Sequence, residues 1–157
     1  MNRDHITERT ISIYLQIAET ARFSADTSLV NSMLLAAHDQ VNNCGQKVDL
    51  NTLIRLAEFL VMAKLTKQAE GIFNSALKKI QAKENNSWLR ARIYDGLAEV
   101  HVVDCRFDKA IRKYEQAIKI MSALPHIDPL TIVSRRRKLA LLNLRQGDLE
   151  KARALLQ

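Results

Sequence analysis

A pattern of small and bulky apolar residues that recurs at an interval of about 41 or 42 positions constrains this chain more than any other feature. Three alanines fix the interval, because Ala69, Ala110 and Ala152 follow one another at nearly equal spacing. A leucine–alanine pair precedes each of them, at Leu56 and Ala57, Leu97 and Ala98, and Leu139 and Ala140. A recurrence of this length predicts helical hairpins that stack on one another. Such stacks usually present a surface to another molecule and carry no reaction chemistry.

The composition is that of a soluble, helical chain. Its 157 residues are 47% hydrophobic and 26% charged, and they include four glycines and two prolines, which fits long helices joined by short turns. We expect one domain over residues 1–157, with units at about 7–45, 49–83, 87–124 and 128–157, the last incomplete. The sequence contains no apolar stretch long enough to span a membrane and no signal peptide, so we expect a cytoplasmic protein without a membrane partner.

Apolar spacing and helix-breaking residues predict an all-α fold of eight helices. The first helix is expected from about Thr7. Asp26 or Ser24 is expected to cap the second helix, and Gly45 suits its C-terminal end. Asp49 or Asn51 can cap the third. Asp128 followed by Pro129 is typical of an N-cap and a first-turn proline, and so predicts the start of the seventh.

The recurring residues resemble the tetratricopeptide repeat. The third unit matches best, with Tyr94, Leu97, Ala98, Phe107, Ala110, Tyr114 and Ala117. The second unit supplies Leu53, Leu56, Ala57, Ala69, Phe73 and Ala76, but Lys64 stands where the turn glycine is usual. The fourth supplies Leu139, Ala140, Gly147, Asp148, Leu149 and Ala152. The first unit is degenerate, and Ala18 and Ala37 are its best candidates.

The resemblance implies a right-handed superhelical array of about four antiparallel helix pairs. The family's usual repeat has about 34 residues. The longer spacing here looks like the long-helix variant of kinesin light chains and of bacterial regulatory scaffolds. The resemblance also implies a non-catalytic scaffold or adaptor that binds a peptide or helix of a partner protein.

In this family the first helices of successive units line a groove. The groove positions carried over to this sequence are Ile54, Glu58, Val61, Met62, Asp95, Glu99, Val102, Val103, Arg137, Leu141, Leu144 and Arg145. They include acidic, apolar and basic residues, so a peptide or helix with an apolar stripe and mixed charge is the expected ligand. The alternative is that these are ordinary residues of helix surfaces. The family's clamp for an acidic chaperone tail needs Lys and Asn at groove positions, which this sequence lacks.

Catalytic, metal and cofactor sites are not expected. The histidines His5, His38, His101 and His126 are dispersed, and none has metal-ligand spacing with another histidine or cysteine. We expect His101 to be a core residue on the packed side of its helix. Cys44 and Cys105 are expected to be reduced and simply packed.

A nucleic-acid-binding helical repeat is an alternative function. The net charge is +7, and residues 134–157 hold seven Lys and Arg residues against two acids, or +5. The run from Arg135 to Lys138 cannot form one patch on a helix, although Arg135, Lys138 and Arg145 could reach phosphates. The interferon-induced RNA-binding repeat proteins are an example of such a helical repeat. A regulatory or chaperone-like protein of secretion or transcription is a further alternative.

The C-terminal end leaves apolar residues without a capping helix. Leu155 and Leu156 stand at the end of the eighth predicted helix, and solenoids need a polar cap to remain soluble. We therefore expect that the chain continues in a longer repeat protein, or that this end contacts a partner or a second copy.

Overall fold

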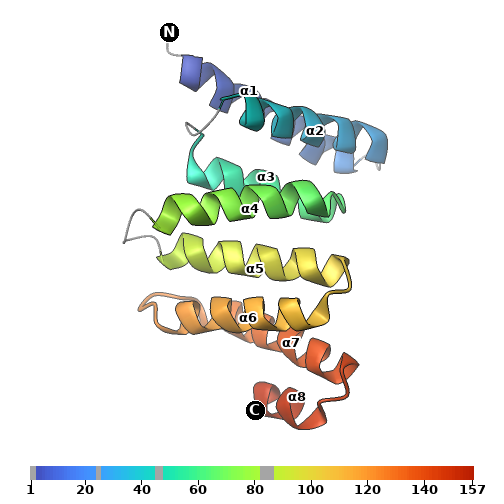
Figure 1. Ribbon diagram of the computed structural model, residues 1–157, viewed down its shortest axis with the longest axis vertical. Helices are drawn as coiled ribbons and strands as arrows, with labels where there is room; N and C mark the ends of the chain where they lie inside the picture. Colours follow the sequence, from blue (N-terminus) through green and yellow to red (C-terminus); the bar gives the residue numbers. More distant parts are fainter. Residues whose placement is uncertain (1–2, 24–25, 45–47, 82–86) are drawn as a thin grey trace. The chain divides into compact units, whose positions relative to one another are not determined.

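The computed structural model describes residues 3–23, 26–44, 48–81 and 87–157, and all regular structure in these ranges is helical (Figure 1). The helices are α1 (Arg3–Phe23), α2 (Thr27–Cys44), α3 (Leu50–Met62), α4 (Thr66–Gln81), α5 (Ser87–Val103), α6 (Phe107–Ser122), α7 (Pro129–Arg145) and α8 (Leu149–Leu156). The eight predicted helices are confirmed over these ranges. The first begins at Arg3, earlier than the expected Thr7, and the predicted end of the second at Gly45 lies outside the described residues.

The chain divides into two compact units, Met1–Lys79 and Ile80–Gln157. The division falls in the last turn of α4, so α1 to α4 belong essentially to unit 1 and α5 to α8 to unit 2. Each unit is described by itself below.

Aspartate side chains cap the N-termini of four described helices, at Asp26, Asp49, Asp128 and Asp148. Asp49 accepts hydrogen bonds from the backbone N–H groups two and three residues later, at 2.9 and 3.2 Å. Asp128 accepts one at 3.0 Å from the N–H two residues later, and Pro129 follows it in the first turn. Asp26 accepts one at 2.9 Å from the N–H three residues later, which confirms it as a cap of α2. Ser24, the other predicted cap, lies outside the described residues. The first N–H groups of a helix have no partner within it, which explains why aspartate is favoured at these positions.

In unit 1, α1 and α2 pack against each other, and both contact α3. Residues three or four positions apart are buried along each helix, as expected for amphipathic helices. They include Ile11, Leu15 and Ala18 of α1, Val30, Leu34 and Ala37 of α2, Leu53, Leu56, Ala57 and Leu60 of α3, and Ala69, Phe73 and Ala76 of α4. Two polar contacts fix the start of α3. The backbone N–H of Asp49 donates to Glu8 Oε1 at 2.9 Å, and Lys79 Nζ donates to the carbonyl of Val48 at 3.3 Å.

In unit 2, α6 packs between α5 and α7, and α8 packs on α7. The core centres on the buried residues Ala98, Ala110, Tyr114, Leu139 and Leu142, with a second cluster of Ala91, Ala117 and Met121. The alanines from facing helices let the two backbones approach closely, and the larger side chains fill the space beside them. His101 is buried as well, with 4% of its surface exposed, which confirms its predicted core position.

The three turns that join α3 to α4, α5 to α6, and α7 to α8 share one backbone conformation. Their central residues are Lys64, Cys105 and Gly147, with φ of 61°, 56° and 83°. In each turn, the N–H of this residue donates to the carbonyl three residues earlier, at 2.9, 3.0 and 3.0 Å. The next N–H donates to the carbonyl five residues earlier, at 2.8, 2.8 and 2.9 Å. This is the Schellman arrangement, which satisfies carbonyls at the end of a helix.

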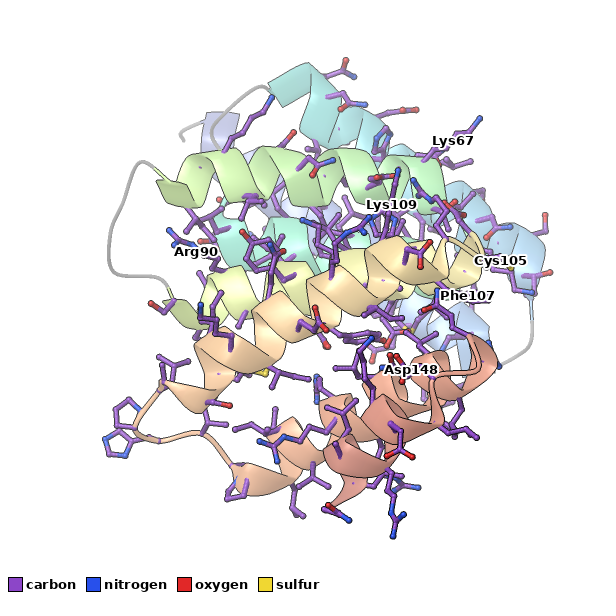
Figure 2. All side chains as sticks on the ribbon, turned by 60° about the horizontal axis from the view of Figure 1, so that its bottom comes forward. Lys67, Arg90, Cys105, Phe107, Lys109 and Asp148 are labelled. Carbon is purple, nitrogen blue, oxygen red and sulfur yellow. The ribbon has the colours of Figure 1, made fainter. Side chains whose placement is uncertain are left out.

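The left-handed residue of the turn need not be glycine here. Lys64, the departure from the family pattern, takes the same conformation as Gly147, and so does the exposed Cys105. Cys105 and Asp148, the residue after Gly147, mark the two turns of unit 2 in Figure 2. An L-residue with a side chain is strained in this backbone conformation, whereas glycine is not. Two of the three turns therefore carry a local strain that is offset by the hairpin packing.

Replacing a strained turn residue by glycine should stabilise the chain. We expect Cys105→Gly to raise the free energy of unfolding by about 1 kcal/mol, because the positive φ no longer costs energy. Urea denaturation followed by circular dichroism measures this change. Gly147→Ala is the matched control. A Cβ added there would meet no atom within 4 Å, so its expected loss of about 1 kcal/mol is conformational. A Cys105→Gly variant no more stable than the wild type would contradict the account.

Candidate functional site

One face of α7 exposes a row of apolar side chains. Leu130, Val133, Leu141 and Leu144 are exposed by 73%, 49%, 60% and 43%. With the exposed Arg137 between them, their spacing of three and four residues places all five on one side of the helix. We call these five residues the α7 stripe. The opposite side of α7 carries the buried residues Leu139, Ala140, Leu142 and Asn143. Since α7 already has a complete buried face, the stripe is not needed for the core of unit 2.

Two ion pairs join α5 to α7. Arg135 binds Asp95 through several contacts: Nη2 lies 2.9 Å from Oδ2, and Nε lies 3.2 Å from each carboxylate oxygen. One turn further along, the ammonium of Lys138 pairs with Glu99. The Arg135 pair is largely shielded from solvent, with side-chain exposures of 26% and 15%. Several contacts between one guanidinium and one carboxylate fix the relative orientation of the two side chains, in addition to pairing their charges.

Tyr114 of α6 completes this polar network. Its hydroxyl donates to Glu99 Oε1 at 2.6 Å, and the residue is 1% exposed. Burial raises the pKa of Tyr114 above its usual value, and the hydrogen bond to Glu99 raises it further, since a nearby carboxylate disfavours the phenolate. The phenol therefore stays protonated and acts as a fixed donor. Three helices of unit 2 meet at the single carboxylate of Glu99.

The predicted groove residues of unit 2 fall into two groups. Arg137, Leu141 and Leu144 lie together on the exposed stripe, to which the structure adds Leu130 and Val133. The others are engaged within the unit or lie apart from the stripe. Asp95 and Glu99 hold ion pairs, half-buried Val102 packs on the core, and Arg145 lies over the ring of Phe107, 5.8 Å from its centre. Val103 is 40% exposed at the end of α5.

The predicted groove residues of α3 in unit 1 are also divided. Ile54 has no exposed surface, which contradicts its placement on an accessible face. The reason is that α3 buries five residues, Leu53, Ile54, Leu56, Ala57 and Leu60, so its core face is wider than the minimal stripe. Glu58 and Val61 are half-buried. Met62 is exposed, and its sulfur accepts a hydrogen bond from Arg22 at 3.0 Å.

The basic run from Arg135 to Lys138 is partly neutralised by these contacts. Arg135 and Lys138, two residues expected to reach phosphates, pair with acids of α5 instead. The sequence held a signal for this, because Asp95 and Glu99 are four apart on one helix, and Arg135 and Lys138 are three apart on another. Each pair occupies one helix face, so the two faces are complementary in charge.

Neither a metal-ligand cluster nor a membrane-spanning helix is present in the part of the chain that the structure describes. Within residues 3–23, 26–44, 48–81 and 87–157, no group of three or more His, Cys, Asp or Glu side chains could hold a metal ion. None of the helices described there has a stretch that is both long and apolar enough to cross a bilayer.

Comparisons with known proteins show the fold. A MamA RS-1 ArsTM double mutant aligns with a TM-score of 0.61 at 15% identity, over 92% of this chain and 70% of that chain. A crystal structure of MamA protein gives a TM-score of 0.54 at 17% identity, over 93% of this chain and 87% of that one. The chain thus has an all-α, tetratricopeptide-type helical repeat fold.

A sequence relative is much longer than this chain. The clustered mitochondria protein homolog of Meyerozyma guilliermondii is 33% identical in an alignment of 128 residues, and the match covers 76% of this chain and 10% of that protein. The chain therefore spans about a tenth of the relative. No family model matches the sequence.

Removing the Tyr114 hydroxyl should change how stability depends on pH. We expect Tyr114→Phe to lower the free energy of unfolding by about 1–2 kcal/mol at pH 8, because Glu99 loses a buried donor. The folded-state pKa of Tyr114 is raised, so its stabilising contribution is complete below pH 10, the ordinary tyrosine value, and falls above it. The difference between wild type and variant should therefore stay constant up to about pH 9 and shrink as the pH rises above 10. Urea unfolding at a series of pH values measures it, and two parallel stability curves would refute the assignment.

Proposed function

We propose that this chain is a non-catalytic scaffold that binds a peptide or helical segment of a partner protein, and that the α7 stripe contacts this segment. The observation that carries the proposal is the exposure of four large apolar side chains in a row on one helix. Scattered exposed apolar residues are normal on protein surfaces, but four in line on one helix face, two on each side of Arg137, are typical of an interaction site.

The chemistry of the stripe defines what it would bind. Apolar side chains at spacings of three and four match a partner helix with apolar residues at the same spacing. Arg137 lies in the middle of the row and offers a positive charge. Arg137 takes no part in the two ion pairs that Arg135 and Lys138 form with the acids of α5. We infer a ligand with an apolar face and a central Asp or Glu.

The internal network supports this assignment. Arg135 and Lys138 fix α7 to α5 from one side, so α7 presents the stripe as a rigid surface. A binding surface that is ordered in advance loses less conformational entropy when the partner docks. The helical repeat fold is consistent with this role, since such folds use exposed helix faces for recognition.

We also propose that the chain has the long form of the repeat, with a period of about 41 or 42 positions. The turn residues support this, since Lys64, Cys105 and Gly147 follow one another at the same intervals as the three alanines and share one backbone conformation. The three helices that follow these turns begin at Thr66, Phe107 and Leu149, again with the same intervals.

A double substitution in the stripe tests the function. Leu141→Asp with Leu144→Asp should weaken partner binding at least tenfold, because two carboxylates would be buried without partners. The measurement compares proteins retained from a lysate by immobilised wild type and variant, quantified by mass spectrometry. The affinity of each differing protein is then measured after purification. Both exposed positions should tolerate the change, and far-UV circular dichroism verifies the helices.

Lys109→Glu is the matched control for this experiment. Lys109, which is labelled in Figure 2, is exposed on α6 of the same unit, whereas the stripe lies on α7. This variant should therefore retain the same proteins as the wild type. If no protein that the wild type binds directly is lost from the double variant, the stripe is not the binding surface.

A further inference from the structure

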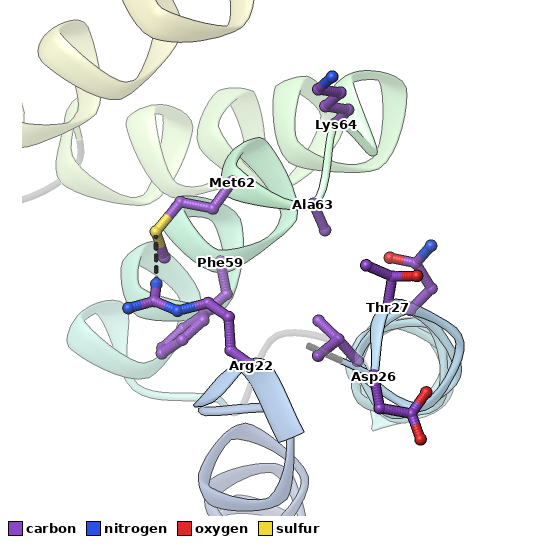
Figure 3. Close-up of a pocket in the computed structure, with 9 residues that line it drawn as sticks. Arg22, Asp26, Thr27, Phe59, Met62, Ala63 and Lys64 are labelled. Carbon is purple, nitrogen blue, oxygen red and sulfur yellow. Dashed lines mark hydrogen bonds between the residues drawn. The ribbon is translucent and has the colours of Figure 1, made fainter. Parts of the chain in front are cut away.

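A cavity of about 310 Å³ lies in unit 1, where the end of α1, the start of α2 and the end of α3 meet (Figure 3). Its apolar wall includes Val30 of α2 and Phe59 and Met62 of α3. Val30 is buried, Phe59 is half-buried, and Met62 is 53% exposed. The volume is at the lower end of the range for ligand pockets, so it suits a bulky side chain better than a whole helix.

A guanidinium stands at the edge of this apolar wall. Arg22 donates through Nη1 to the sulfur of Met62 at 3.0 Å, as the dashed line in Figure 3 shows. Arginine has five N–H donors, and a thioether is a weak acceptor. Among the ion pairs that the structure gives for its described residues, none includes Arg22. The cation thus lies beside an apolar surface with most of its hydrogen-bonding capacity open to a ligand.

Polar groups face the cavity from the side of α2. Thr27 and Asn31 line it and offer a hydroxyl and an amide. Asp26 lines it too, but its Oδ1 accepts the hydrogen bond that caps α2, and its carboxylate points away from Phe59 and Met62 in Figure 3. A ligand carboxylate would therefore be directed to the Arg22 side, while the hydroxyl and the amide can bond to peptide groups.

We propose that this cavity binds a short acidic peptide segment of a partner protein, with a bulky apolar side chain next to an Asp or Glu. The apolar side chain would pack on Phe59 and Met62, and the carboxylate would accept two hydrogen bonds from Arg22. Methionine adapts its shape to different apolar groups, which suits a site that must close around a side chain. This site is separate from the α7 stripe and stands independently of it.

A fluorescent peptide tests the proposal. The probe is fluorescein-labelled Gly-Ser-Asp-Leu-Phe-Asp-Glu-Ser-Gly, and fluorescence anisotropy with the full chain measures its dissociation constant. Arg22→Gln should weaken binding about tenfold through loss of the charged hydrogen bonds. Met62→Asp should weaken it at least tenfold, because a carboxylate would replace the apolar wall and repel the probe.

Two control variants show whether binding of the probe is specific to this cavity. Lys67→Gln removes one positive charge from an exposed position of α4 that is not among the lining residues, and it should leave affinity within twofold. The Leu141→Asp, Leu144→Asp variant should also bind the probe normally, so failure of the stripe and failure of the cavity are distinguishable.

Several results would overturn the proposal. The first is that the wild type binds a probe in which lysines replace the acids as tightly as it binds the acidic probe. The second is that Arg22→Gln or Met62→Asp binds the acidic probe as tightly as the wild type does. The third is that the wild type shows no saturable binding at millimolar concentration. Displacement of the probe by octanoate as readily as by unlabelled peptide would also overturn it, since the cavity would then select a small apolar acid without using the peptide groups.

Discussion

The close contact of paired helices at alanine is the constraint on which the rest of this structure depends. Ala98 of α5 and Ala110 of α6 belong to one buried cluster with Tyr114, and a larger side chain at either position would force the two backbones apart. The contact also holds the strained turn between the helices, because Cys105 keeps its left-handed conformation only while both helices are packed. Sequence period, turn geometry and core packing are therefore consequences of one requirement.

The same packing determines which charges remain available at the surface. Once α6 lies between α5 and α7, Tyr114 reaches Glu99, and the long side chains of Arg135 and Lys138 reach the acids of α5. These contacts use the acidic groups that the sequence pattern assigned to a ligand. What remains exposed on α7 is mainly apolar, with Arg137 as its central charge. The sequence predicts a groove face of mixed charge, whereas the exposed face of α7 is mainly a row of apolar residues.

How well the sequence predicts a feature of this structure depends on how far apart in the chain the interacting residues lie. Helices, aspartate caps and buried alanines depend on residues within one or two turns, and these predictions are correct. Ile54 is different, because a spacing pattern does not say how wide a buried face is. The contact between Arg22 and Met62 joins residues 40 positions apart. Long, flexible side chains choose among several partners, and only the packed arrangement decides which one they meet.

The two proposed surfaces differ in what they ask of a ligand. The α7 stripe is a row of exposed side chains along one helix, so its binding energy would come from apolar area spread over several turns. The cavity of unit 1 is small and concave, so its energy would come from one buried side chain and one charged pair. A partner suited to the first must be helical over several turns, whereas a partner for the second needs only a few residues. The chain could thus engage two segments of different kinds, and because each surface is built within one unit, neither depends on the other.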